Sequence, residues 1–93
     1  MHNFTPSERK EIYDRAIAQF GEAHQIMKCV EEMSELTKEI CKSSGGEKNR
    51  LHMAEEIADV QITVEQLIQI FDLDQLVKDY RDIKLELLIK RIE

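Results

Sequence analysis

The chain has 93 residues, of which 34% are charged, and its formal net charge is −6. This length allows one domain at most, which we take to span residues 1–93. Acidic residues are spread along the whole chain, so it lacks the basic stripe with which proteins bind a nucleic-acid polymer. No apolar run approaches about 18 residues and the N-terminus lacks the apolar region of a signal peptide, so we expect a cytoplasmic protein with no membrane partner.

The first expected element is a helix from about Pro6 to Phe20. Thr5 and Glu8 have the spacing of a capping box, and Pro6 suits the first helical position because its missing N–H would have no helical partner there. Gly21 follows as the expected helix stop.

Two longer helices should come next, one from about Glu22 to Lys42 and one from about residues 48–49 to Phe71. Both carry apolar residues at the helical period. The Ser-Ser-Gly-Gly segment at 43–46 is the clearest helix breaker in the chain. A loop this short predicts that the two helices pack antiparallel.

The last expected helix runs from about Gln75 to Ile92, with Asp74 as its N-cap. Its apolar residues cover more than one face of the helix. They are Leu76, Val77, Tyr80, Ile83, Leu85, Leu87, Leu88, Ile89 and Ile92. A terminal helix of a short monomer does not need so much apolar surface, so we expect it to pack against a second copy in a homodimer or homotetramer. The predicted fold class is therefore all-α, a four-helix bundle assembled as an oligomer.

Two pairs of acids stand on the second and third expected helices: Glu32 with Glu35, and Glu56 with Asp59. Each pair has i,i+3 spacing, which places both carboxylates on one helix face, where their like charges repel. The arrangement becomes favourable when a divalent cation lies between the carboxylates. Four oxygen ligands suit Mg²⁺ and also Mn²⁺, so the sequence predicts a site for one of these ions.

Further charged residues lie near these pairs. Glu31 and Glu55 are spare acids, and either could accept a proton from water or be an ordinary solvent-facing glutamate. Four cations are candidates for binding phosphate, although each could also be an ordinary surface cation. They are Lys28, Lys38, Lys48 and Arg50. Tyr13 and Phe20 of the first helix are candidates for a base pocket, with core packing as the alternative.

The order Glu31-Glu32-x-x-Glu35, then twenty residues, then Glu56-x-x-Asp59 resembles the motif of the MazG-like all-α nucleoside triphosphate pyrophosphohydrolases. The run 55–60 together with Glu65-Gln66-Leu67 is most similar to small phage-type and prophage-type members. The resemblance covers nearly the whole chain in helix order and length.

The resemblance implies an oligomeric helical bundle with Mg²⁺ held by Glu32, Glu35, Glu56 and Asp59. It also implies hydrolysis of a ribo- or deoxyribonucleoside triphosphate between its α and β phosphates, giving the monophosphate and pyrophosphate. Control of the nucleotide pool, or removal of unwanted nucleotides, would be the corresponding role.

Three alternatives compete with this interpretation. Phosphoribosyl-ATP pyrophosphatases usually carry a Tyr-His pair after the second acidic motif, where this chain has Gln61-Ile62-Thr63. Ferritin-like di-iron bundles use Glu-x-x-His, and no histidine here has an acid three residues before it. A non-catalytic helical interaction module is the third alternative, and the intact set of four acids argues against it.

Overall fold

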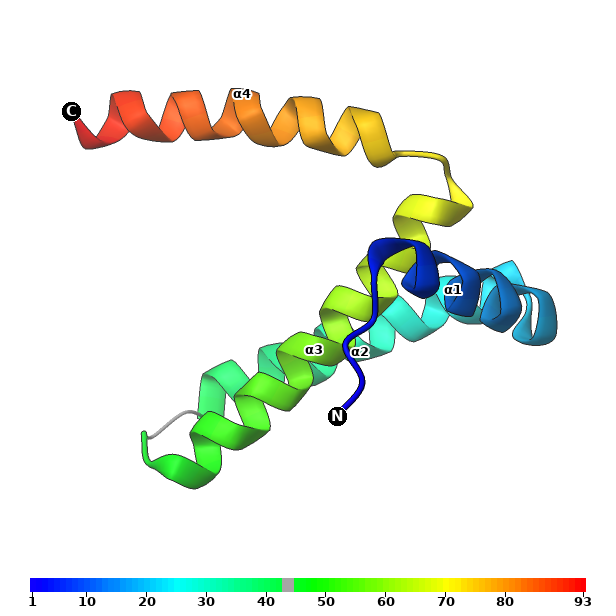
Figure 1. Cartoon of the computed structure of the whole chain (residues 1–93). Coiled ribbons are helices and arrows are strands. Elements are labelled where there is room, and N and C mark those ends of the chain that lie inside the picture. Colours follow the sequence, from blue (N-terminus) through cyan, green and yellow to red (C-terminus); the bar gives the residue numbers. More distant parts are fainter. Residues whose placement is uncertain (43–44) are drawn as a thin grey trace.

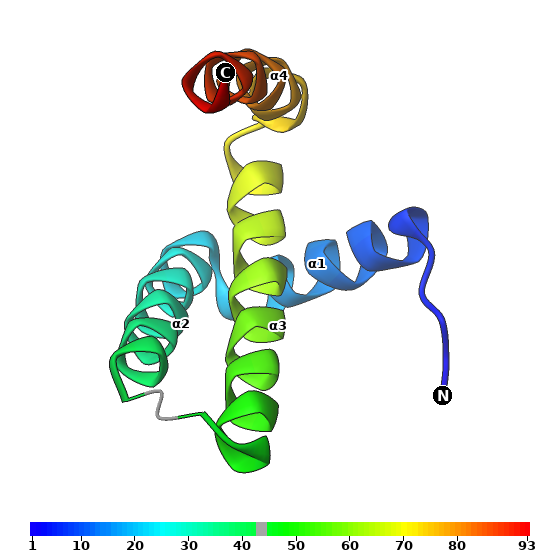
Figure 2. The same ribbon diagram turned by 90° about the vertical axis from the view of Figure 1, so that its left-hand side faces the viewer.

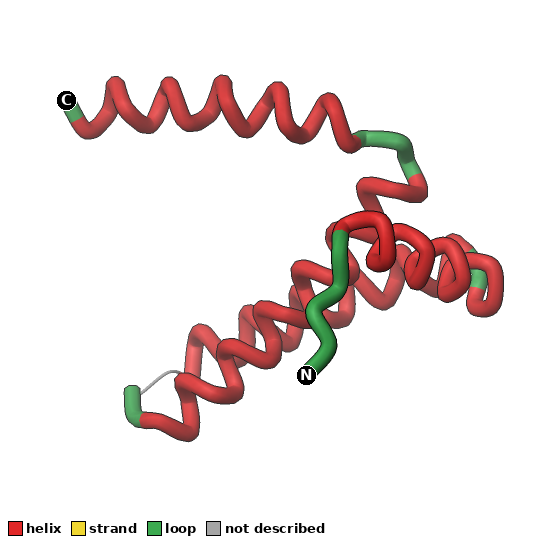
Figure 3. Tube along the Cα trace, in the orientation of Figure 1, coloured by secondary structure: helices red, strands yellow, loops and turns green. Residues whose placement is uncertain are grey.

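The computed structural model describes residues 1–42 and 45–93, and within these it contains helices and no strand (Figure 3). In chain order the helices are α1 (Pro6–Phe20), α2 (Glu22–Lys42), α3 (Glu47–Ile70) and α4 (Asp74–Ile92). The prediction of an all-α chain with four helices is confirmed for the described residues. Of the predicted Ser-Ser-Gly-Gly loop, Ser43 and Ser44 lie outside them.

The two ends of α1 are set by the residues that the sequence indicated. The Thr5 hydroxyl accepts a hydrogen bond from the Glu8 backbone N–H at 3.1 Å, and the Glu8 carboxylate accepts one from the Thr5 N–H at 2.9 Å. A cap of this kind stabilises a helix by about 1 kcal/mol. Gly21 ends the helix at a φ of 92°, and its N–H donates to the Ile17 carbonyl at 2.8 Å. The positive φ explains why glycine is suited to this position.

The main helix–helix contact joins α2 and α3, which run antiparallel and side by side (Figures 1 and 2). Gly45 and Gly46 precede α3 with φ values of 82° and 90°, a region of backbone space that favours glycine. The buried residues of the two helices lie along this contact, which we call the α2–α3 seam. They are Gln25, Cys29, Thr63 and Gln66.

Helix α1 is attached to α3 through a polar contact near its first turns. Tyr13 is buried, and its hydroxyl donates to the Glu65 carboxylate at 3.0 Å. Arg9 Nε donates to the same carboxylate oxygen at 3.1 Å. One acid of α3 therefore fixes two side chains of α1.

The start of α4 differs from the prediction, because Asp74 is not the N-cap. Leu73 occupies that position, and Asp74 is the first residue of the helix. The chain turns at Asp72, whose φ is 53°, and the Leu73 N–H donates to the Ile68 carbonyl at 2.9 Å, which closes the end of α3. Helix α4 then begins one residue early, because the Leu73 carbonyl accepts its first hydrogen bond from the Val77 N–H at 2.8 Å. The Asp74 carboxylate instead pairs with Lys78 Nζ at 2.9 Å, and it lies in the first turn, where the helix dipole favours a negative charge.

Helix α4 extends away from the other three helices and has no buried residue (Figures 1 and 2). Among the described residues, Tyr13 and Cys29 are the apolar side chains that are buried, whereas the large apolar side chains of α4 are about half exposed. The whole chain exposes 7656 Å² to solvent. Taken alone, it therefore has a small core and an extensive apolar surface.

Candidate metal centre

Three of the four predicted ligands meet on the α2–α3 seam. Glu32 of α2 and Glu56 and Asp59 of α3 each offer a carboxylate oxygen, and these three oxygens lie within 4.8 Å of one another. The i,i+3 spacing brings the two α3 acids to one face of that helix. The antiparallel packing of α2 then places Glu32 opposite them. We call these three residues the carboxylate triad.

The triad is electrostatically unfavourable without a cation. Glu56 Oε2 is buried and has no hydrogen-bond partner among the described residues. Burial raises the pKa of the Glu56 carboxyl above its ordinary value, and the neighbouring negative charges, with Asp59 first and Glu32 next, raise that pKa further. A buried carboxylate oxygen normally has a partner. A divalent cation would supply one, so the donor set fits such an ion.

Glu35, the fourth predicted ligand, lies outside the triad. Its carboxylate accepts a hydrogen bond from Lys38 Nζ at 3.5 Å, and its side chain is 53% exposed. It is still close enough for its charge to contribute to the raised pKa of Glu56. Lys38, which was a candidate for binding phosphate, thus pairs with Glu35, which was a predicted metal ligand.

Lys28 is the predicted cation that stands beside the triad. Its Nζ lies 3.5 Å from a Glu32 oxygen and 3.7 Å from a Glu31 oxygen. Because Lys28 contacts both acids, it links the more exposed Glu31 to the partly buried Glu32.

The other two predicted cations lie near the start of α3, away from the triad. Arg50 pairs with Glu47 at 2.9 Å, and its side chain is 75% exposed. Arg50 and Lys48 precede Glu56 by six and eight residues, which is roughly 9 to 12 Å along the helix axis. The described conformation therefore does not bring either of them to the triad.

A cavity of about 350 Å³ opens directly beside the triad and shares Glu32 and Asp59 with it. Lys28 and Phe20 also line this cavity, so two residues singled out in the sequence meet here. Its remaining wall comes from residues that were not predicted to belong to the site, although Gln66 stands in one of the runs that carry the family resemblance. They are His24, Gln25, Ile62, Thr63 and Gln66. One signal could have found the two glutamines: each lies seven residues, two helical turns, from a triad acid on its own helix.

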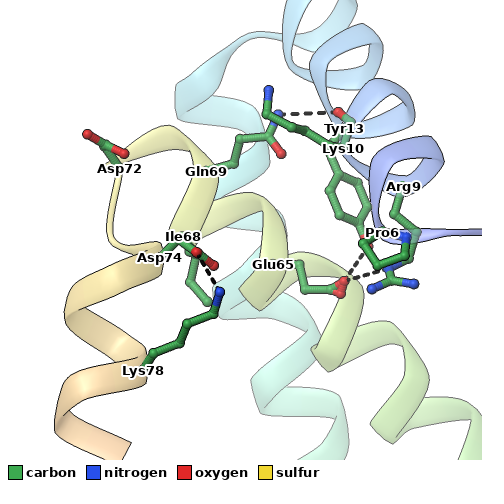
Figure 4. Close-up of a pocket in the computed structure, with 10 residues that line it drawn as sticks. All are labelled: Pro6, Arg9, Lys10, Tyr13, Glu65, Ile68, Gln69, Asp72, Asp74 and Lys78. Carbon is green, nitrogen blue, oxygen red and sulfur yellow. Dashed lines mark hydrogen bonds and ion pairs between the residues drawn. The ribbon is translucent and has the colours of Figure 1, made fainter.

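A larger cavity, about 640 Å³, lies between α1, α3 and the start of α4 (Figure 4). Several of its polar groups pair with one another: Glu65 accepts from both Tyr13 and Arg9, and Asp74 pairs with Lys78. Burial, reinforced by the hydrogen bond to Glu65, raises the pKa of Tyr13 to about 12, so this hydroxyl is firmly protonated at neutral pH. The cavity shares no residue with the triad. Tyr13 thus lies in a different cavity from Phe20.

Within the part of the chain that the structure describes, no helix combines the length and apolar character needed to cross a membrane. No protein-family profile, curated protein or solved structure matches the chain. Its function is therefore inferred from the geometry of the carboxylate triad and of the cavity beside it.

Proposed function

We propose that this protein is a Mg²⁺-dependent nucleoside triphosphate pyrophosphohydrolase of the MazG-like type. It would cleave a ribo- or deoxyribonucleoside triphosphate to the monophosphate and pyrophosphate, and its role would be to control the nucleotide pool or to remove unwanted nucleotides. The observation that carries the proposal is the convergence of Glu32, Glu56 and Asp59 beside a cavity, with one buried carboxylate oxygen lacking a partner.

The donor set suits a hard divalent cation. All three ligands are carboxylates, which Mg²⁺ and Mn²⁺ prefer over softer ligands. Mg²⁺ binds oxygen at about 2.1 Å, so two ligands on opposite sides of one ion are about 4.2 Å apart. The spread of up to 4.8 Å in the triad is close to this value. Glu35 would be the fourth ligand, and its carboxylate would leave its ion pair with Lys38 to bind the ion.

The chain's own residues have separable roles in this scheme. The triad and Glu35 would hold the ion, which when bound would neutralise phosphate oxygens and activate water. Lys28, beside Glu32 and on the cavity wall, binds a phosphate oxygen of the substrate. Glu31 or Glu55 would take the proton of the attacking water on a carboxylate oxygen. The water oxygen forms a bond to the α phosphorus. At the same time the bond between the α phosphorus and the bridging oxygen breaks, and that oxygen leaves as part of pyrophosphate. Lys38, Lys48 and Arg50 remain candidates for outer phosphate contacts.

We also propose that the protein is a homo-oligomer, a homodimer or homotetramer, in which α4 is an interface helix. A folded monomer of this mass exposes about 5,600 Å² by the usual scaling of surface with size. The chain exposes 7656 Å², an excess of roughly 2,000 Å². Two copies would together have an excess of roughly 4,000 Å², and obligate homodimers bury about 2,000 to 5,000 Å² in total between their subunits. A second copy covering α4 would account for the excess.

The direct test is to incubate the purified protein with Mg²⁺ and each of the common ribo- and deoxyribonucleoside triphosphates, and to separate the products. Monophosphate and pyrophosphate in equal amounts are expected from at least one substrate. Diphosphate with orthophosphate would assign a different reaction. An absence of hydrolysis with every nucleotide would favour the non-catalytic interaction module.

A further inference from the structure

The cavity beside the triad has two chemically different ends. At one end are the carboxylates of Glu32 and Asp59, and at the other end are the amides of Gln25 and Gln66. Seven residues separate the acid from the glutamine on each helix, which is about 10 Å along the seam. The cavity therefore runs from the proposed metal and phosphate end to a buried amide end.

The two amides are rigidly placed. Gln25 and Gln66 are only 7% and 6% exposed, although each carries a polar side chain. Gln25 Nε2 donates to Gln66 Oε1 at 2.5 Å across the seam. Gln25 Oε1 lies 2.9 Å from His24 Nδ1, and because an amide oxygen only accepts, the Nδ1 of His24 carries the proton. Both ends of the Gln25 amide are thus hydrogen-bonded, and its bond to Gln66 Oε1 fixes the orientation of the Gln66 amide.

This chain of hydrogen bonds leaves one amide donor without a partner among the described residues, and that donor belongs to Gln66, which lines the cavity. The oxygens of both amides accept bonds within the chain, whereas Gln66 Nε2 donates to none of the described residues. Phe20 and His24 lie on the same cavity wall, with ring centroids 5.8 Å apart and planes inclined by 34°. Aromatic faces of this kind can contact the flat face of a nucleobase.

We propose that Gln66, positioned by Gln25 and His24, is a specificity-determining residue that donates a hydrogen bond to a carbonyl oxygen of the base. The favoured substrates would be triphosphates of 4-oxopyrimidines and 6-oxopurines. An amino group at the same ring position would face the Gln66 donor with another donor and leave it unpaired. This inference rests on the proposed function, because it requires the triphosphate to be held at the triad.

Two pairs of substrates test this contact. UTP and CTP differ at ring position 4, and ITP and ATP differ at ring position 6, in each case as oxo against amino, and the adjacent ring nitrogen carries a hydrogen only beside the oxo group. The wild type should show a kcat/KM roughly ten- to a hundredfold higher for UTP and ITP than for their partners, since a buried unpaired donor is costly. Gln66→Met and Gln25→Met should reduce both ratios to near one, mainly through KM. Inhibition by magnesium pyrophosphate, which has no base, should not change.

Gln69→Met is the matched control, since Gln69 lies on α3 beside the other cavity and bonds to the Lys10 carbonyl and to Asp14. If Gln66→Met does not fold, Gln66→Glu serves instead: it replaces the donor by an acceptor and should invert both ratios. Ratios that are near one in the wild type, or that survive both methionine variants, would overturn this inference and leave the proposed function standing. A wild type that hydrolyses none of the common ribo- or deoxyribonucleoside triphosphates would overturn both.

Discussion

Gln25 Nε2 donates a hydrogen bond to Gln66 Oε1 at 2.5 Å across the α2–α3 seam, and this contact defines the register in which the two helices pack. Moving seven residues forward along α2 and seven back along α3 leads to Glu32 and Asp59, two members of the triad. The acids and the amides thus belong to one seam, two helical turns apart. A change in the packing of α2 against α3 would disturb both ends of the cavity together.

The triad acids should be required for catalysis and dispensable for folding. Glu32→Gln, Glu56→Gln and Asp59→Asn each remove one negative charge from a crowded group, so we expect melting temperatures without Mg²⁺ that are unchanged or raised. Each change also removes a proposed metal ligand, and activity should fall by more than about a hundredfold. Circular dichroism melts and initial rates of pyrophosphate release measure the two effects.

Glu11→Gln is a suitable control for these variants, because Glu11 is exposed on α1 and lies outside both cavities. It should retain wild-type activity. Normal turnover by all three triad variants would show that the metal site has been placed wrongly.

Lys38→Met should increase the affinity for Mg²⁺. Lys38 holds the Glu35 carboxylate at 3.5 Å, and its removal frees that acid to join the triad. Because an exposed ion pair of this kind contributes little energy, the expected gain is about two- to fivefold in Kd. Mg²⁺ titration followed by thermal shift measures it. Lys38→Met combined with Glu35→Gln should lose the gain, and a gain that persists in the double variant would exclude Glu35 as the cause.

The raised pKa of Glu56 predicts how stability depends on pH. The folded state holds this proton to a higher pH than the unfolded state, whose glutamate has an ordinary pKa of 4.5. Stability contributed by the neutral carboxyl is therefore complete below 4.5 and is lost as the pH rises through the raised pKa of the folded state. Thermal melts in Mg²⁺-free buffers from roughly pH 4 to pH 8 should show this decline.

Glu56→Gln cannot ionise, so its melting temperature should decline less than that of the wild type over the same pH range. Above that window, Mg²⁺ should raise the melting temperature of the wild type more than that of the variant, because a ligand stabilises in proportion to its binding. Parallel pH curves for the two proteins would contradict the assignment of the effect to Glu56.

Much of the fold follows from local sequence signals. Thr5, Glu8 and Gly21 determine the ends of α1 through short-range hydrogen bonds and one positive φ, which are readable from residue type. The N-cap of α4 is Leu73, one residue before the predicted Asp74. The turn at Asp72 that precedes it depends on a hydrogen bond from the Leu73 N–H to the Ile68 carbonyl, which residue preferences do not encode.

The candidate site was partly predictable for a similar reason. The i,i+3 spacing of Glu56 and Asp59 is a local property of one helix, so it could be read directly. The pairing of Gln25 with Gln66 depends on the register between two helices and is a tertiary property. The engagement of Glu35 by Lys38 depends on side-chain rotamers, which the spacing alone does not determine.

Leu88→Glu should dissociate the proposed oligomer or shift its equilibrium strongly towards the monomer. Leu88 is 47% exposed on α4, and a charge there would oppose burial against a second copy. Lys84→Gln changes the net charge by the same amount on the same helix and should leave the assembly intact. Sedimentation equilibrium should give at least twice 10.9 kDa for the wild type and for this control. A wild type that is active as a monodisperse monomer would refute the interface.

The central claim, that Glu32, Glu56 and Asp59 form a divalent-cation site, is tested most directly by Mn²⁺ binding followed by electron paramagnetic resonance. Free Mn²⁺ gives a strong signal that is lost on binding, so the titration reports affinity and stoichiometry without relying on catalysis. We expect saturable binding to the wild type and to Glu11→Gln, competition by Mg²⁺, and binding at least about tenfold weaker in Glu32→Gln, Glu56→Gln and Asp59→Asn. Equal Mn²⁺ binding by all five proteins, or none by the wild type, would contradict the claim.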